Sequence, residues 1–169
     1  IKASRVENKE LVKHNCGVYL NSIPIDSNTG FSAIPYKEAE KRGYYKIDFL
    51  SLSVYDNILT EKHLDKLLAM PPLWEILEDE RLVSELFQIK DHFSIINKIR
   101  PKSVEELAIC IALIRPGKRY LVDKTMEEIR NNIWLPDESG FIFKKSHAIG
   151  YALVIVVQMN LMMEELEDD

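Results

Sequence analysis

The segment SVEELAICIALIRPG, residues 103–117, decides the fold of most of the chain. Ser103 and Glu106 have the spacing of a capping box, in which the hydroxyl accepts from a free backbone N–H and the glutamate reaches back to the cap. Pro116-Gly117 stops the helix at Arg115 or just before it. Between these signals runs one apolar stripe at helical spacing, made of Val104, Leu107, Ala108, Ile111 and Ile114. The segment therefore predicts an amphipathic helix.

The helical pattern extends on both sides of this segment. From Ser51 onward the apolar residues recur with a period close to 3.6. Thr125 and Glu128 form a second capping box, and Asp79 is a candidate cap for another helix. The apolar run from Ala148 to Met163 is sixteen residues long, short of the ~20 that cross a bilayer. It predicts a buried helix and no contact with a membrane.

The N-terminal part has a different pattern. Residues 16–20 form a short apolar run, and residues 23–35 are rich in turn formers. In the stretch 44–50 aromatic and branched residues dominate, with Lys46 and Asp48 facing one side of a strand. The sequence thus predicts an α+β fold, mainly α, with short strands followed by helices. The expected division is residues 1–55, a helical domain over 56–163, and a solvated acidic tail over 164–169.

Composition fits a folded domain of modest size. Of 169 residues, 46% are apolar and 29% are charged, which excludes wholesale disorder and a large multidomain protein. The net charge is −5, but the last six residues hold five carboxylates, so the rest of the chain is neutral overall. Global charge therefore decides nothing about nucleic acid, and any basic surface must be local.

Cysteine usage and the first residues bear on location. Cys16 and Cys110 lie 94 residues apart and imply neither a disulfide framework nor a zinc module, so a reducing, cytoplasmic location is expected. The chain begins without Met and without an apolar signal segment, which suggests a piece of a longer or processed protein that carries no secretion signal.

Lys46 and Asp48 are the first candidate site. Two residues apart on a strand, their Cα atoms are ~6.5–7 Å apart on one face. A carboxylate there can hold Mg²⁺ while the ammonium meets a phosphate that the metal bridges. A solvated strand face with a weak Lys–Asp pair explains the same pattern.

The second candidate site is Lys144-Lys145-Ser146-His147, directly before the apolar helix. With Ser146 as the N-cap, two lysines and an imidazole at a helix N-terminus would bind an anion. The alternative is a surface loop with ordinary lysines and a capping serine.

Three cations around the helix stop, Arg115, Lys118 and Arg119, form the third candidate site. Residues 115–145 contain seven Lys/Arg against five Asp/Glu, a bias that suits a phosphate backbone. A helix C-terminus favours cations in any case. His14 and Cys16 can share a strand face, which we interpret as packing.

With these sites located, the order of motifs resembles the C-family polymerases, represented by the catalytic subunit of bacterial replicative DNA polymerase III. The segment HNCGVYL at 14–20 resembles the palm segment His-Ala-Ala-Gly-Val-Val-Ile, and KIDFLSL at 46–52 resembles the palm motif Lys-Phe-Asp-Phe-Leu-Gly-Leu. Residues 86–88, 101–117 and 143–153 resemble segments of the fingers, in the family's order.

The resemblance implies roles for the candidate residues. Asp48 would coordinate catalytic Mg²⁺ and Lys46 would lie against the incoming triphosphate. Arg115, Lys145, Ser146 and His147 would belong to the fingers surface that faces nucleotide and template. The implied reaction is two-metal transfer of a nucleotide to a primer 3′-hydroxyl.

Departures from the family limit what the chain does alone. Residues 1–169 contain no match to the paired catalytic aspartates or to the phosphate-binding Gly-Ser motif, and Ser51 replaces the usual glycine. We therefore expect a palm remnant plus fingers, similar to the reduced polymerases of some bacteriophages, acting on primer–template and dNTP together with another polypeptide or the rest of the polymerase. The alternatives are a non-catalytic module that binds DNA or a replication protein, and an unrelated helical interaction domain.

Overall fold

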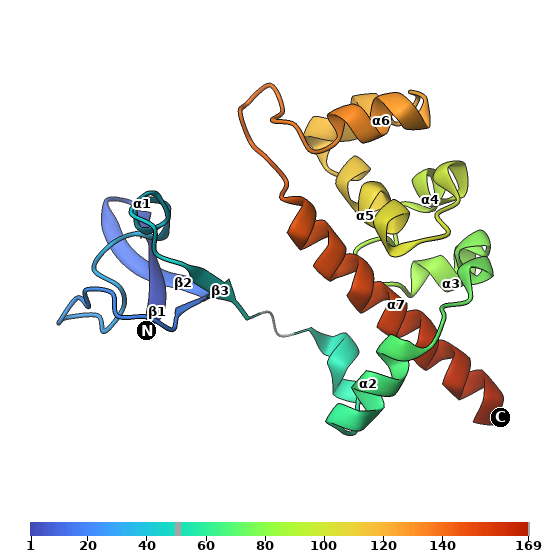
Figure 1. Cartoon of the computed structure of the whole chain (residues 1–169), viewed down its shortest axis with the longest axis horizontal. Coiled ribbons are helices and arrows are strands. Elements are labelled where there is room, and N and C mark those ends of the chain that lie inside the picture. Colours follow the sequence, from blue (N-terminus) through green and yellow to red (C-terminus); the bar gives the residue numbers. More distant parts are fainter. Residues whose placement is uncertain (50–51, 169) are drawn as a thin grey trace. The chain divides into compact units, whose positions relative to one another are not determined.

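The structure, a computed structural model, describes residues 1–49 and 52–168, with side chains as far as Leu166. Two compact units divide the chain, the N-terminal unit Ile1–Leu52 and the helical unit Ser53–Asp169 (Figure 1). The boundary between the units thus falls after Leu52, whereas the sequence predicted it after residue 55. Leu50 and Ser51, including the glycine replacement in the second palm-like motif, lie outside the described residues.

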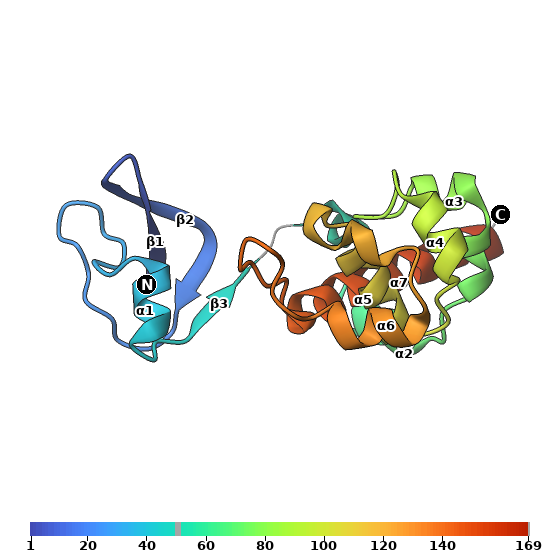
Figure 2. The same ribbon diagram turned by 90° about the horizontal axis from the view of Figure 1, so that it is seen from above.

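An antiparallel sheet of order β1-β2-β3 forms the N-terminal unit, with β1 Lys2–Glu7, β2 Glu10–Tyr19 and β3 Lys46–Asp48. Asn8 and Lys9 connect β1 to β2, and both have positive φ, as a tight hairpin turn requires. Figure 2 shows that β2 curves strongly, so that its first part pairs with β1 and its end also pairs with β3. The sequence did not predict β1, because charged residues interrupt its apolar pattern.

The core of the N-terminal unit is small. Helix α1, Tyr36–Lys41, contacts β1 and contributes Ala39 to the core. In the described part of this unit, the buried apolar cluster consists of Ala3, Tyr19, Ile23 and Ala39. Ser4 and Ser32 are buried beside it, and the Ser4 hydroxyl donates to the Ser32 carbonyl at 2.7 Å. Little apolar area therefore holds this unit together.

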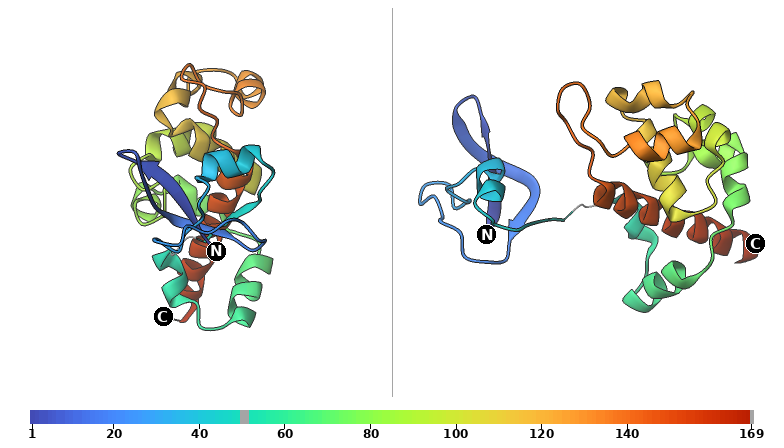
Figure 3. Two further views of the ribbon diagram at one scale, coloured as in Figure 1. Left: turned by 90° about the vertical axis from the view of Figure 1, so that its left-hand side faces the viewer. Right: turned by 45° about the horizontal axis from the view of Figure 1, so that its top comes forward.

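The helical unit is built around α5, Val104–Leu113. Every residue from Leu107 to Leu113 is buried, so burial extends beyond the expected single apolar stripe: this part of α5 is covered on all sides, whereas Glu105 in the first turn is exposed. Its main partner is α7, Lys145–Asp168. In Figure 3, α2 (green) lies on one side of α7 and α5 (yellow) on the other.

Short helices complete this unit and confirm the predicted α+β, mainly α, class. They are η1 Ser53–Asn57, α2 Glu61–Ala69, η2 Trp74–Glu78, α3 Glu80–Ser84, α4 Phe93–Ile99, η3 Pro116–Leu121 and α6 Met126–Asn132. Asp79 caps α3, and Thr125 and Glu128 form a complete capping box on α6. Ser103 caps α5, but the Glu106 carboxylate accepts from the N–H of Lys102 rather than closing a box on Ser103.

Two polar residues that interrupt the apolar run of α7 hold neighbouring segments. The Gln158 amide accepts from the N–H of Phe87 at 2.8 Å and donates to the carbonyl of Glu85 at 2.7 Å. Asn160, which is buried, donates to the carbonyls of Leu67 and Met70 at 2.7 and 3.1 Å. These contacts attach α7 to the ends of α2 and α3.

Helix α7 also bears on two sequence predictions. It continues to Asp168, so residues 164–168 are helical, and Glu164 accepts from Lys66 at 2.5 Å and lies 2.8 Å from the ring of His63. The predicted solvated tail is therefore wrong for Glu164. By length and composition residues 145–166 could cross a membrane, but half of the apolar window is buried inside the structure, as in the core helix of a globular protein.

Candidate functional site

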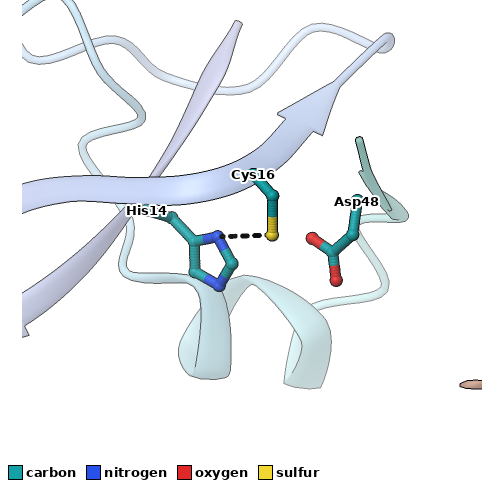
Figure 4. A group of neighbouring side chains, drawn as sticks. All are labelled: His14, Cys16 and Asp48. Carbon is teal, nitrogen blue, oxygen red and sulfur yellow. Dashed lines mark hydrogen bonds between the residues drawn. The ribbon is translucent and has the colours of Figure 1, made fainter. Parts of the chain in front are cut away.

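The pairing of β2 with β3 gathers four polar side chains in the N-terminal unit. Gly17 lies opposite Asp48 in the antiparallel register, and Tyr19 lies opposite Lys46. Asp48 thereby approaches His14 and Cys16 of β2, and the Cys16 sulfur lies between the imidazole and the carboxylate (Figure 4). We call His14, Cys16 and Asp48 the donor cluster.

Donor atoms of the cluster lie within 4.8 Å of one another. The Cys16 Sγ is 3.9 Å from Nδ1 of His14, which accepts a hydrogen bond from the N–H of Gly17 at 3.0 Å. Nε2 therefore carries the ring proton when the imidazole is neutral. Lys46 forms an ion pair with Asp48, and their side chains are 19% and 27% exposed. The Lys–Asp pair of the solvated-face alternative is therefore present, with both side chains partly covered.

Burial and charge set the protonation of the donor cluster. Burial, helped by the charge of Lys46, lowers the pKa of His14. Burial, followed by the charge of Asp48, raises the pKa of the Cys16 thiol. Burial acts to raise the pKa of Asp48, but the hydrogen bond and charge of Lys46 outweigh it and lower that pKa. At neutral pH the cluster is therefore an imidazole, a thiol and a carboxylate, and the protonated thiol is a poor nucleophile.

Neighbouring side chains pack closely against the backbone at Gly17, which leaves little room for a larger residue. A Cβ at this position would lie 2.7 Å from Cδ of Lys46, 2.9 Å from Nδ1 of His14 and 3.0 Å from the Cβ of Ala3. Tyr36 encloses the same group, with its ring 4.9 Å from that of His14 and 5.7 Å from the Lys46 ammonium. The glycine of the first palm-like motif therefore lets β2 approach these side chains.

The cations predicted around the end of α5 separate into different roles. Lys118 is only 3% exposed, and its ammonium donates to the carbonyls of Asn132 and Leu135 at 2.9 and 2.8 Å. It serves the fold and is not available to a phosphate. Arg115 is half-buried, donates to Gln88 at 3.0 Å, and lies over the Phe143 ring at 4.7 Å. Arg119 is exposed.

The start of α7 differs in detail from the prediction. The helix begins at Lys145, and the carbonyl of Lys144 accepts the N–H groups of His147 and Ala148. Ser146 therefore lies in the first turn, and its prediction as the N-cap is wrong. Lys144, Lys145, Ser146 and His147 are all exposed, and Lys145 forms an ion pair with Glu105 at 2.5 Å. This basic start remains accessible.

Sequence reasoning missed that His14 and Cys16 join Asp48. The signal was present as an alternating His-x-Cys pair on a strand, but it was interpreted as packing. Tyr36 carried no signal, because it reaches the cluster from α1. No family model, curated protein or solved structure matches this chain.

Proposed function

We propose that the chain is the palm remnant and fingers of a DNA-directed DNA polymerase that resembles the C-family enzymes, and that it requires a second polypeptide for nucleotidyl transfer. One observation carries the proposal. Residues 17–19 of the first palm-like motif pair with residues 46–48 of the second, and this pairing lies beside the ionised Asp48 carboxylate and its neighbours His14 and Cys16. The fingers-like motifs follow in order on the helical unit.

In the N-terminal unit, Asp48 is the residue suited to Mg²⁺. Magnesium prefers oxygen ligands and keeps several waters, so neither the imidazole of His14 nor the thiol of Cys16 suits it. Mg²⁺, when bound, would stabilise charge on the attacking and leaving oxygens. Lys46, once released by the carboxylate, would be free to contact a triphosphate. One carboxylate is too few for two ions ~4 Å apart, and the partner is proposed to supply the others.

In the helical unit, the start of α7 is proposed to bind the DNA phosphate backbone. The helix is 24 residues long, and the N–H groups of its first turn carry the partial positive charge of the helix dipole, although that of His147 already donates to the Lys144 carbonyl. The exposed residues Lys144, Lys145 and His147 surround them. Helix N-termini and lysines bind phosphates without reading sequence, so this contact would be salt-dependent.

Charge reversal at Lys144 and Lys145 is expected to weaken primer–template binding about tenfold or more and to reduce the salt dependence, because about two phosphate contacts are lost. Fluorescence anisotropy of labelled primer–template at several salt concentrations measures both. The matched control is Lys62→Glu with Arg81→Glu, which changes net charge equally at exposed positions of α2 and α3. Equal weakening by both double variants would assign the effect to net charge alone.

The chain alone, with primed template, dNTPs and Mg²⁺, is expected not to extend the primer. Adding a polypeptide that carries the paired aspartates should restore extension, and Asp48→Asn should abolish the restored activity. Gel analysis of a labelled primer measures this, and extension by the chain alone would contradict the proposed division of the catalytic site.

A non-catalytic module that binds DNA or a replication protein is the second candidate. The donor cluster has a single carboxylate, which is too few for a two-metal catalytic site and therefore favours this candidate. Salt-dependent DNA binding together with no restored extension would select this candidate over the split enzyme.

A further inference from the structure

The donor cluster has the chemistry of a transition-metal site. It offers one nitrogen, one sulfur and one oxygen donor from two adjacent strands, all within 4.8 Å. Imidazole and thiolate are ligands of borderline and soft ions, whereas magnesium selects oxygen. We propose that His14, Cys16 and Asp48 bind a thiophilic divalent cation of the Zn²⁺ type, with a fourth position left to water or another ligand.

Geometry supports this assignment. In a tetrahedral zinc site the ligand bond lengths set the distance between sulfur and nitrogen donors at about 3.5 Å. The Cys16 Sγ and His14 Nδ1 are 3.9 Å apart, which is within a few tenths of an ångström of that value before the ring turns. A Cβ at Gly17 would collide with Nδ1 of His14, so the glycine leaves the imidazole its present position beside Cys16.

Three existing interactions change when the cation binds. The Cys16 thiol loses its proton to solvent as the sulfur becomes a thiolate ligand. Lys46 releases the Asp48 carboxylate, and the ammonium moves away from the cation. The His14 ring turns a nitrogen lone pair toward the ion in place of the hydrogen bond from Gly17. Each change is local to side chains and leaves the pairing of β2 with β3 intact.

The site differs from a cysteine-rich zinc module because it uses one cysteine and leaves a ligand position open. It does not rest on the proposed function, since binding is measured on the chain without DNA. Where both hold, Asp48 is shared, so the thiophilic cation and Mg²⁺ exclude one another at this carboxylate.

Titration of the reduced, metal-free chain with Co²⁺ tests the proposal, because a thiolate ligand gives Co²⁺ a charge-transfer absorption band. We expect one equivalent to bind with this band and Zn²⁺ to displace it, because a tetrahedral site with thiolate and imidazole ligands suits Zn²⁺. Cys16→Ser should abolish the band. His14→Gln and Asp48→Asn should each weaken binding by about tenfold or more, since even residues that only support metal ligands change affinity 10–100-fold.

Cys110 provides the matched control. It is buried in α5 of the helical unit, so Cys110→Ala should keep the band. A second measurement needs no substitution: Zn²⁺ should shift backbone NMR signals of the unmodified chain at residues 13–18 and 46–49. The proposal would be overturned if the absorption band were absent, if it survived Cys16→Ser, or if Asp48→Asn left binding unchanged. It would also be overturned if Zn²⁺ shifted only NMR signals outside residues 13–18 and 46–49. DNA binding by the basic start of α7 is a separate readout, so the two proposals fail separately.

Discussion

Lys118→Met is expected to lower the free energy of unfolding of the helical unit by about 3 kcal/mol while leaving DNA binding by the folded protein unchanged. The Lys118 ammonium is buried and donates to the carbonyls of Asn132 and Leu135, at and just beyond the end of α6. Methionine fills similar space but donates nothing. Hydrogen bonds from a charged group contribute about 1.5–3 kcal/mol each, and carbonyls left without a partner in the interior add a cost.

Urea denaturation followed by circular dichroism measures this loss. Lys124→Met, at an exposed position close in the sequence, is the control and should change the free energy of unfolding by less than about 0.5 kcal/mol. A stable Lys118→Met protein with weakened primer–template binding would reverse the interpretation and return Lys118 to the phosphate-binding residues that the sequence suggested.

Asn160→Leu is expected to cost the helical unit about 3 kcal/mol, although it makes α7 more apolar. The buried Asn160 amide donates to the carbonyls of Leu67 and Met70 at the end of α2. Leucine would leave both acceptors without that donor in a region that water does not reach easily. Each buried carbonyl left without a donor costs about 1–3 kcal/mol, so the two together outweigh the roughly 1.5–3 kcal/mol that burying a leucine side chain contributes.

Gln158→Leu is the matched comparison on the same helix. Its partners are the N–H of Phe87 and the carbonyl of Glu85, and Gln158 is only half-buried. Water can replace part of what is lost, so the decrease measured by urea denaturation should be smaller than for Asn160→Leu. An equal or greater decrease for Gln158→Leu would show that burial does not set the size of the effect.

Local chemistry predicted much of the helical unit. The Thr125 and Asp79 caps and the stop at Pro116-Gly117 are short-range signals, and helices begin or end where they stand. Long-range packing explains what was missed. Covering α5 on all sides depends on segments distant in sequence, and the burial of Lys118 depends on where α6 ends, so periodicity alone could not reveal either.

The same contrast between local and long-range contacts explains why only part of the candidate site could be predicted. Lys46 and Asp48 are two apart on a strand, so their ion pair follows from local geometry. That His14 and Cys16 join them depends on the register between β2 and β3, which no short-range pattern fixes. Ser146 is not the cap because α7 begins at Lys145, two residues before the position at which a Ser146 cap would start it.

The small core of the N-terminal unit has a consequence for its amide protons. Among the described residues of this unit, two of the four in its buried apolar cluster, Ala3 and Ala39, are alanines, and so short a chain buries little surface for its length. Backbone N–H groups of β2 and β3 should therefore exchange with deuterated solvent earlier than those of α5. A cation at a hundred times its dissociation constant would raise the free energy of opening by about 2.7 kcal/mol. Cation binding, more than hydrophobic burial, would then set the exchange rate of the amide protons in these strands.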